Sequence, residues 1–282
     1  IIFEIYMNSI TSINSYSVDT TENDTESPQY LSFPEICWTA NTDALISFSN
    51  GQYKNYGKKL AIPNTVTFAN PDNIFSFDAN NVKFGNGSLK HTMSTNILNY
   101  LRIDNFVMKT TTGFSACCWF RYTNLHATGG LIFGSNLFTY SGRTSSVQII
   151  FTNATTIRVN LGFKYVSNNW TSCYQDFNIS TYGISNNGNW NHIGYSISTT
   201  GVVTLVVNGT SITWNSGNVI YLYPTGSPAY VYLADNSRAY FFYVGSSNAS
   251  GNSCFEGNTD QLRLYNATLT VQNFQDIYNN GC

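Results

Sequence analysis

Residues 188–210 read GNWNHIGYSISTTGVVTLVVNGT, and this stretch has the pattern of a β-hairpin. Apolar side chains occupy every second position from Ile193 to Ile197, as in a strand that buries one face. A Ser-Thr-Thr-Gly turn follows at residues 198–201. The second arm, residues 202–207, is almost wholly β-branched or apolar and is closed by Asn208-Gly209. The sequence therefore predicts two antiparallel strands here.

The composition of the whole chain favours a large β-sheet domain. Of its 282 residues, 42% are hydrophobic and 16% aromatic, so a sizeable core can form and disorder is not expected. Only 10% are charged, against roughly 25% in an average domain. The net charge of -2 and the absence of a basic run argue against nucleic acid as a partner. No stretch approaches the roughly 18 consecutive apolar residues of a membrane helix, so membrane insertion is not expected.

Short apolar or alternating segments recur along the chain, separated by Pro, Asn and Gly. The predicted strands, besides the hairpin, are residues 44–49, 64–68, 73–77, 114–122, 131–134, 147–151, 156–163, 219–223, 230–233, 239–244 and 261–265. Residues 50–59 and 165–187 are expected to be loops. Thr270 is expected to cap one short C-terminal helix, with Val271, Phe274 and Ile277 at helical spacing. The absence of helix-length segments between strands excludes a βαβ fold and leaves a sandwich or a barrel.

The first 36 residues differ from the rest and are predicted to be an N-terminal arm and polar linker, followed by one domain at residues 37–282. Residues 1–16 alternate loosely and are compatible with one strand, whereas residues 17–28 (SVDTTENDTESP) are acidic and polar. The chain begins with Ile, so it is expected to be a processed product or a fragment. Three roles stay open for the arm: adding a strand to a neighbouring subunit, packing on its own domain, or connecting to a further domain.

Four motifs in order resemble the concanavalin A-like jelly-roll domains of the laminin-G and pentraxin type. They are VKFGNGSLK at residues 82–90 with Tyr-x-x-Ile at 100–103, GFSACCWFRYTN at 113–124, the Trp-x-His and Val-Asn-Gly of the hairpin at 189–209, and GNTDQLRLYNATLTVQNFQDIYN at 257–279. The resemblance covers roughly residues 40–282. It implies an all-β, two-sheet antiparallel jelly-roll sandwich in which the first and last strands are adjacent.

The resemblance also bears on the six cysteines. Adjacent ends of the domain would bring Cys37 and Cys282 together, and a disulfide there would close a very long loop, an effect of about 4–5 kcal/mol in the chain-entropy model. A second candidate pair is Cys173 with Cys254. Cys117 and Cys118 are neighbours in a predicted strand, so their side chains are expected to point to opposite faces and to be buried thiols.

No catalytic, metal or cofactor site is predicted. Glycosidases of this superfamily carry paired carboxylates on one strand, and no predicted strand here has acids at i and i+2. The loops that match the calcium loops of pentraxin-like relatives, residues 144–146 and 246–248, contain no carboxylate. His192 has no nucleophile in a motif with it and is interpreted as a packed or turn-bonded residue.

Two tryptophans in predicted loops, Trp170 and Trp214, are the candidate glycan contacts, with core packing as the alternative for each. Eight Asn-x-Ser/Thr sequons are candidate N-glycosylation sites: Asn23, Asn86, Asn153, Asn169, Asn178, Asn208, Asn248 and Asn266. The chain is so rich in Asn, Ser and Thr that this number is close to the chance expectation. The sequons therefore permit secretion without establishing it.

Two functions compete. The first is a non-enzymatic structural or assembly protein of an extracellular, cell or virion surface, whose partners are further copies of itself or other surface proteins, possibly polymerising through the N-terminal strand. The second is a carbohydrate-binding or adhesion module with glycan partners, an inference by analogy of fold.

Overall fold

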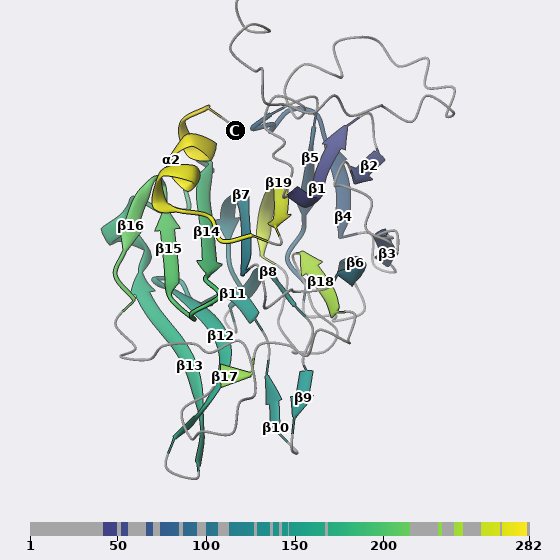
Figure 1. The fold of residues 1–282 in the computed structure, drawn as a ribbon. Coiled ribbons are helices and arrows are strands. Elements are labelled where there is room, and N and C mark those ends of the chain that lie inside the picture. The colour runs from purple at the N-terminus through teal and green to yellow at the C-terminus, as the bar shows by residue number, and fades with distance from the viewer. Residues whose placement is uncertain are drawn as a thin grey trace, which may run out of the picture.

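The computed structural model describes residues 42–49, 52–55, 66–69, 74–84, 87–94, 100–106, 113–126, 129–135, 138–140, 143–145, 147–166, 169–214, 231–232, 240–244, 255–265 and 267–280. Within them the chain forms two large antiparallel sheets in two layers, as Figure 1 shows. The all-β sandwich prediction is confirmed. The N-terminal arm, residues 1–36, lies outside the described residues.

The nine-stranded sheet, here called sheet A, contains the predicted hairpin. Its order is β16 (Thr210–Ile212), β15 (Val203–Val207), β14 (Asn191–Ile197), β7 (Phe114–Asn124), β19 (Glu256–Tyr265), β1 (Thr42–Ser49) and β2 (Gln52–Asn55), with β5 (Ser88–His91) on β19 and β4 (Phe75–Asp78) on β5. The first described strand, β1, pairs with the last, β19. This is the adjacency that the family resemblance implies.

The eight-stranded sheet, here called sheet B, lies behind sheet A in Figure 1. Its order is β13 (Asn169–Asn178), β12 (Thr156–Val166), β11 (Val147–Asn153), β8 (Gly130–Ser135), β18 (Tyr240–Val244), β6 (Tyr100–Phe106) and β3 (Val66–Ala69), with β17 (Val231–Tyr232) on β12. A separate two-stranded ribbon joins β9 (Phe138–Tyr140) to β10 (Arg143–Ser145).

The hairpin of β14 and β15 forms in the predicted register, with Ile193 opposite Val207 and Ile197 opposite Val203. Asn208 and Gly209 both have positive φ, 47° and 75°, which is the type I′ geometry that matches the twist of flanking strands. This turn leads into β16, a third strand that the sequence reading missed. The Asn-Gly pair was interpreted as the end of the hairpin, whereas it is the turn of a second one.

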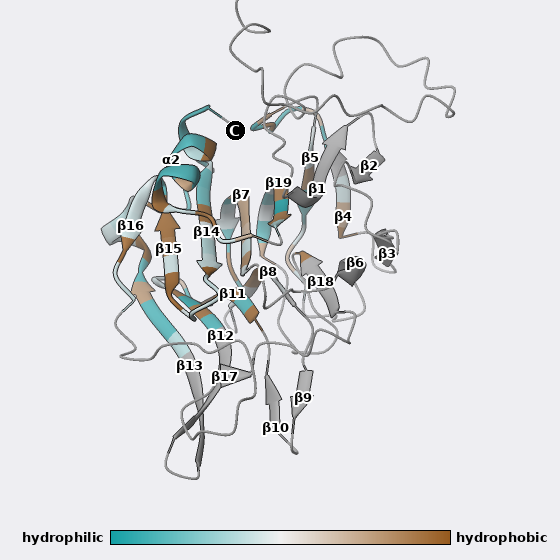
Figure 2. Cartoon of the chain, in the orientation of Figure 1, coloured by the Kyte–Doolittle hydropathy of each residue, from teal (hydrophilic) through white to brown (hydrophobic). Residues whose placement is uncertain are grey.

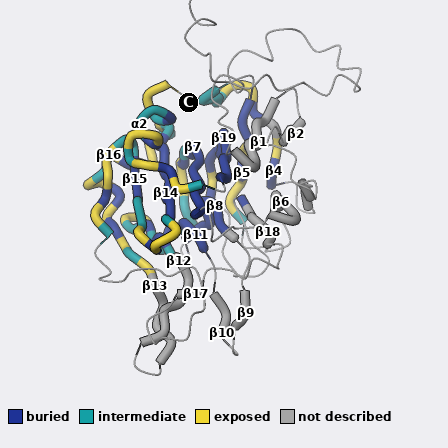
Figure 3. Tube along the Cα trace, viewed as in Figure 1, coloured by how far each residue is buried: buried dark blue, intermediate teal, exposed yellow. Residues whose placement is uncertain are grey.

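The inter-sheet core consists of the alternate residues of each strand. Ile193 and Tyr195 of sheet A and Ile149 and Val159 of sheet B are fully buried in it. Figure 2 shows the alternation of hydrophobic and hydrophilic residues along the strands, and Figure 3 shows the buried residues concentrated on the central strands. Period-two patterning thus fixes which face of each strand meets the other sheet.

A second, smaller apolar cluster lies on the outer face of sheet A. The helix α2 (Val271–Asn280) packs there through Phe274 and Ile277, which contact Val206 and Cys117. Thr270 caps the helix as predicted, since its Oγ1 accepts a hydrogen bond from the N–H of Asn273. Cys118, the neighbour of Cys117, belongs instead to the inter-sheet core, so the prediction that the two buried thiols face opposite ways is confirmed.

Two segments predicted to be loops contain strands. Residues 50–59 contain β2, and residues 165–187 contain β13 and a 3-10 turn, η2 (Ile179–Tyr182). β13 was missed because it ends sheet B and most of its described outward residues are polar, so the apolar signal of a buried strand is weak. The predicted strand at residues 219–223 lies outside the described residues.

Candidate functional site

The best-defined polar and aromatic surface lies on the outer face of sheet B, where β12 and β13 run side by side. Ile157 of β12 and Phe177 of β13 point into the core, and their alternate neighbours point away from it. Among those outward residues, Arg158 contacts both Tyr174 and Asp176. We call them the Tyr174–Arg158–Asp176 cluster.

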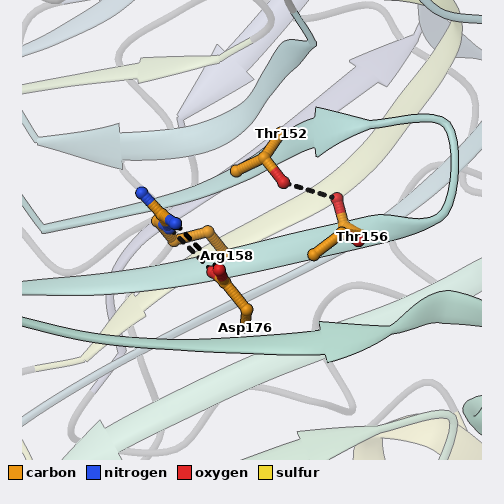
Figure 4. A network of polar contacts seen from close by, with 4 residues as sticks. All are labelled: Thr152, Thr156, Arg158 and Asp176. Atoms are coloured by element: carbon orange, nitrogen blue, oxygen red, sulfur yellow. Dashed lines mark hydrogen bonds and ion pairs between the residues drawn. The ribbon is translucent and has the colours of Figure 1, made fainter.

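Arg158 and Asp176 are directly opposite each other in the β12–β13 register. Arg158 donates from Nε to Oδ1 of Asp176 at 2.7 Å and from Nη2 to Oδ2 at 2.8 Å, as Figure 4 shows. This two-pronged geometry fixes the plane of the guanidinium and leaves Nη1 without a partner among the described residues. The hydrogen bonds to Asp176 raise the pKa of Arg158, so the group stays charged.

Tyr174, the third member of the cluster, lies two residues before Asp176 on the same face of β13. The Cζ atom of Arg158 lies 3.9 Å from the centre of the Tyr174 ring, a cation–π contact. The tyrosine is 43% exposed, and among the side chains that the structure describes it is the one exposed aromatic residue. One face of the ring is therefore covered by a fixed cation while the side chain still presents a large apolar surface to solvent.

The neighbouring β11–β12 turn is held by its own polar contacts. Thr152 of β11 donates from Oγ1 to the carbonyl oxygen of Thr156 at 3.3 Å, close to the ion pair (Figure 4). On the far side, Gln175 of β13 donates from Nε2 to the carbonyl oxygen of Thr213 at 3.0 Å. The Gln175–Thr213 bond connects the edge of sheet B to the chain that follows β16 of sheet A. It therefore holds in place the strand that carries Tyr174 and Asp176.

Two buried carboxylates of the described chain, Asp260 and Asp78, have structural partners. Asp260 is fully buried in β19 and accepts from the backbone N–H groups of Lys83 and Phe84, each at 3.1 Å, and of Gln261 at 2.8 Å. Burial raises the pKa of Asp260 to about 7 even though these hydrogen bonds lower it. These bonds fasten residues 83–84 to the middle of β19, and Lys83 and Asp260 are 177 residues apart in sequence.

A second buried carboxylate, Asp78, holds the turn after β4. It accepts from the side chains of Asn81 at 2.8 Å and Asn258 at 3.0 Å, and from the backbone N–H groups of residues 80 and 81. Burial acts to raise its pKa, but the hydrogen bonds together lower it to about 2. Asp78 is thus a bonded turn residue.

His192 is fully buried beneath α2, where its ring packs against Trp119 at 5.1 Å and Tyr278 at 6.2 Å. Burial, with Arg263 and Lys83 nearby, lowers the pKa of His192 to about 3, so the imidazole is neutral. Its position agrees with the packed role inferred from the sequence. The described residues contain no group of three His, Cys, Asp or Glu side chains placed to hold a metal ion.

The two predicted glycan-contact tryptophans occupy different environments. Trp170 is a strand residue of β13, opposite Tyr165, rather than a loop residue, and its side chain is outside the described set. Trp214 follows β16, is partly buried and packs against the inter-sheet core. Contact with glycan stays a prediction for both. The residues that sequence reasoning missed are Tyr174, Arg158 and Asp176, and the local sequence of residues 174–178 (YQDFN) has no regular alternation that would have marked them.

The remaining predicted sites are only partly within the described chain. Cys37, Cys254 and Cys282 lie outside it, as does the side chain of Cys173 in β13, so both disulfides stay predictions. Asn23, Asn86, Asn248 and Asn266 are also outside, and Asn169 is described only as a backbone position of β13. Asn153 and Asn178 are exposed at strand ends, and Asn208 is half-buried in the β15–β16 turn.

A laminin-G family model, described as the concanavalin A-like lectin/glucanases superfamily, matches residues 96–274. The chain belongs to this superfamily. The match covers most of both sheets and reaches α2 at Phe274, so the resemblance read from the four motifs is confirmed. No curated protein matches the sequence.

Solved structures with a similar fold include toxin binding domains. The binding domain of botulinum neurotoxin serotype G has a TM-score of 0.55 and 13% identity, covering 84% of this chain and 50% of that one. The botulinum neurotoxin serotype D ligand-binding domain, in complex with N-acetylneuraminic acid, has a TM-score of 0.54 and 10% identity, and the match covers 84% of this chain and 50% of that one. Trypanosoma rangeli sialidase in complex with the inhibitor DANA has a TM-score of 0.50 and 11% identity, and the match covers 98% of this chain and 37% of the sialidase.

These likenesses concern the fold, because the identities are low. The chain spans about half the length of the two toxin domains and about a third of the sialidase. This lectin/glucanase-superfamily chain is therefore comparable to a part of each of those proteins.

Proposed function

We propose that the protein is a non-catalytic carbohydrate-binding module and that the Tyr174–Arg158–Asp176 cluster is its sugar-contact surface. The observation that carries the proposal is an exposed tyrosine ring backed by an arginine that a carboxylate holds in place. An aromatic ring with a polar end suits a sugar, which has an apolar face and a rim of hydroxyls. Because Tyr174 and Arg158 are already held in place before the sugar binds, less conformational entropy is lost on binding.

The chemistry of the cluster favours a neutral oligosaccharide. The charge of Arg158 is balanced by Asp176 at 2.7 Å, so the pair offers little net attraction to an acidic sugar. The free Nη1 group supplies hydrogen-bond donors and the carboxylate of Asp176 supplies acceptors, and sugar hydroxyls use both. Superfamily membership and neighbours that are binding domains support a binding role.

The buried and paired carboxylates of the described residues have structural partners, which fits the non-enzymatic part of the proposal. Asp176, Asp260 and Asp78 are each engaged by donors, and none lies beside another carboxylate in the contacts of the described residues. Retaining glycoside hydrolysis needs two carboxyl groups about 5–5.5 Å apart. One of the structural neighbours is a sialidase, but a shared fold does not imply a shared activity.

A glycan array followed by titration calorimetry tests the proposal. The full chain, with and without calcium, is expected to bind neutral oligosaccharides in preference to sialylated ones. Tyr174→Ala is expected to weaken binding at least tenfold, and Arg158→Ala severalfold. Val202→Ala, on the exposed hairpin turn of sheet A, is the matched control and should bind as wild type. Unchanged affinity of Tyr174→Ala, or no glycan bound under either condition, contradicts the proposal.

Assembly is the second candidate, and the edge of β13 favours it. β13 ends sheet B over ten residues, and no strand of the described chain pairs with its outer side. A strand at the end of a sheet can accept a strand from another copy, which is one use of the N-terminal arm. Sedimentation velocity would compare the full chain with a chain that begins at residue 37. Loss of self-association in the shorter chain supports the role, and a monomeric full chain contradicts it.

The setting proposed for either role is an extracellular, cell or virion surface. Relatives with this fold include toxin binding domains, which fits a surface-associated protein. None of the helices in the described segments is long and apolar enough to cross a membrane.

A further inference from the structure

We propose that Asn153 and Asn178 form a paired N-glycosylation site at one end of sheet B, and that Asn208, a third sequon in the described chain, is a structural residue that stays unmodified in the folded protein. All three share the Asn-x-Ser/Thr pattern, so sequence cannot separate them. The hydrogen bonds of their side-chain amides distinguish Asn208 from the other two. The inference does not depend on the proposed sugar-binding role.

The side chains of Asn153 and Asn178 have the same local geometry. Oδ1 of Asn153 accepts from the backbone N–H and the hydroxyl of Thr155, each at 2.9 Å. Oδ1 of Asn178 accepts from the backbone N–H of Ser180 at 3.0 Å and from its hydroxyl at 2.8 Å. In both, Oδ1 is held by the hydroxyl residue of the sequon. The Nδ2 group has no partner among the described residues, and both asparagines are exposed.

Asn208 differs at every one of these points. Its Oδ1 accepts from the backbone N–H of His192 at 2.8 Å. Its Nδ2 donates to the carbonyl oxygen of Tyr182 at 3.1 Å and to Oδ1 of Asn191 at 3.3 Å. Both amide hydrogens are therefore in use, and the residue is half-buried at a positive φ of 47°. A sugar on this nitrogen would replace one donor and would have to displace the η2 turn.

The chemistry explains why Nδ2 decides the outcome. The co-reactant is a lipid-linked oligosaccharide diphosphate. A bond forms between Nδ2 and the anomeric carbon of the sugar, and the bond from that carbon to the diphosphate oxygen breaks. The lipid diphosphate leaves with the electron pair, and the amide gives up one proton. The modified nitrogen keeps a single N–H, which is sufficient at Asn153 and Asn178 and insufficient for the two bonds of Asn208.

The two accepted positions are close in space. Thr156, the first residue of β12, is paired with Asn153 on one side and with Asn178 on the other. Two strand spacings separate the asparagines, which is roughly 10 Å. Asn178 is also two residues from Asp176 on β13, so it shares the outer face of sheet B. Glycans at this pair would line the end of the sheet next to the Tyr174–Arg158–Asp176 cluster.

The experiment is site-specific occupancy. The full chain is produced behind a secretion signal in a eukaryotic host, and the secreted, folded fraction is treated with an N-glycanase in ¹⁸O water before peptide mass spectrometry. Asn153 and Asn178 are expected to be mostly converted to labelled aspartate, and Asn208 below a tenth of that extent. Occupancy of Asn208 in the folded fraction, or unmodified Asn153 and Asn178, overturns the proposal.

Two variants separate modification from folding. Thr210→Ala removes the sequon of Asn208 while keeping its amide contacts, so secretion and stability should match wild type. Asn208→Gln lengthens the side chain that makes the contacts, so secreted yield should fall in the same host. Equal yields of Asn208→Gln and wild type contradict the structural role of Asn208.

Discussion

Gly194 of β14 and Phe274 of α2 are in direct contact across the outer face of sheet A. A Cβ atom at position 194 would lie 2.6 Å from Cε1 of Phe274 and 2.7 Å from Cβ of Cys117. Real Cβ atoms do not approach other atoms this closely. The absence of a side chain at residue 194 is therefore what lets the helix lie on the sheet.

Gly194→Ala is expected to lower the free energy of unfolding by about 1–3 kcal/mol, because the methyl group overpacks a filled contact. Phe274→Ala, which empties the same contact, is expected to cost about 3–5 kcal/mol. Urea denaturation measures both. Gln272→Ala on the exposed side of α2 is the control and should change stability by less than about 0.5 kcal/mol. A Gly194→Ala protein as stable as the control would show that the helix does not rest on this strand.

Asp260→Asn is expected to destabilise the fold by about 1–3 kcal/mol, since the carboxylate accepts three backbone hydrogen bonds and an amide turns a donor toward some of them. Residues 83–84 lose their tether as a result. Hydrogen exchange of the Phe84 amide should accelerate in the variant. Asp276→Asn, on α2, is the control, and unchanged exchange at residue 84 in Asp260→Asn would contradict the tether.

Stability should fall as the pH drops from about 6.5 to about 4. Burial lowers the pKa of His91 and His192 to about 3, so unfolding takes up two protons below the unfolded value of 6.5. The pKa of Asp260, raised to about 7, acts oppositely, because the folded state holds a proton that the unfolded state releases above 3.8. The unfolded state therefore binds two protons more through the histidines and one fewer through Asp260, a net uptake of one proton on unfolding. The free energy of unfolding should then change by about 1.4 kcal/mol per pH unit.

Two variants should move that slope in opposite directions. His91 packs between Phe75 and Phe255, so His91→Phe replaces it with another ring and should bring the slope near zero. Asp260→Asn should roughly double it. Urea midpoints at pH 6.5, 5.5 and 4.5 and constant ionic strength give the slopes. Equal slopes in both variants would mean that other groups dominate.

Cys117 and Cys118 should resist thiol reagents in the native protein. Both are fully buried, and burial raises the pKa of Cys117 to about 12 and that of Cys118 well above its usual value. The thiolate is the reactive form, so alkylation at pH 8 should occur only after unfolding. Mass spectrometry of iodoacetamide-treated native protein checks this, and modification of either residue within minutes would contradict its burial.

Non-reducing peptide mapping of the same sample tests the predicted disulfides. Peptides that link Cys37 to Cys282 and Cys173 to Cys254 are expected, and a free Cys37 thiol would rule out the first pairing.

The sequence predicted those features whose signal is local. The alternation of residues 193–197 and the valine run before Asn208-Gly209 specify a hairpin regardless of its neighbours. Thr270 and the spacing of Phe274 and Ile277 likewise specify a capped, one-sided helix. Strand β13 carries no such signal, because an edge strand needs only one apolar face and its polar residues resemble those of a loop.

The candidate site was not predictable for the same reason. Arg158 and Asp176 are 18 residues apart and meet only because β12 and β13 pair in one register. The contact of Asp260 with Lys83 spans 177 residues, and no local pattern encodes it. Sequence reasoning favoured Trp170 and Trp214 because both were expected in loops, whereas the proposed contact, Tyr174, lies on a strand and is distinguished by its exposure and by its contact with Arg158.

The place of β19 in sheet A has a consequence for biosynthesis. β19 pairs with β7 on one side and with β1 on the other, yet of these strands it is translated last. While the ribosome is still making residues 256–265, β1 and β7 have no strand to join them, and the outer face of sheet A still lacks α2. Sheet A can therefore close only after residues 256–265 have been made, and until then the β1 and β7 sides of the sheet each expose an edge that β19 later covers.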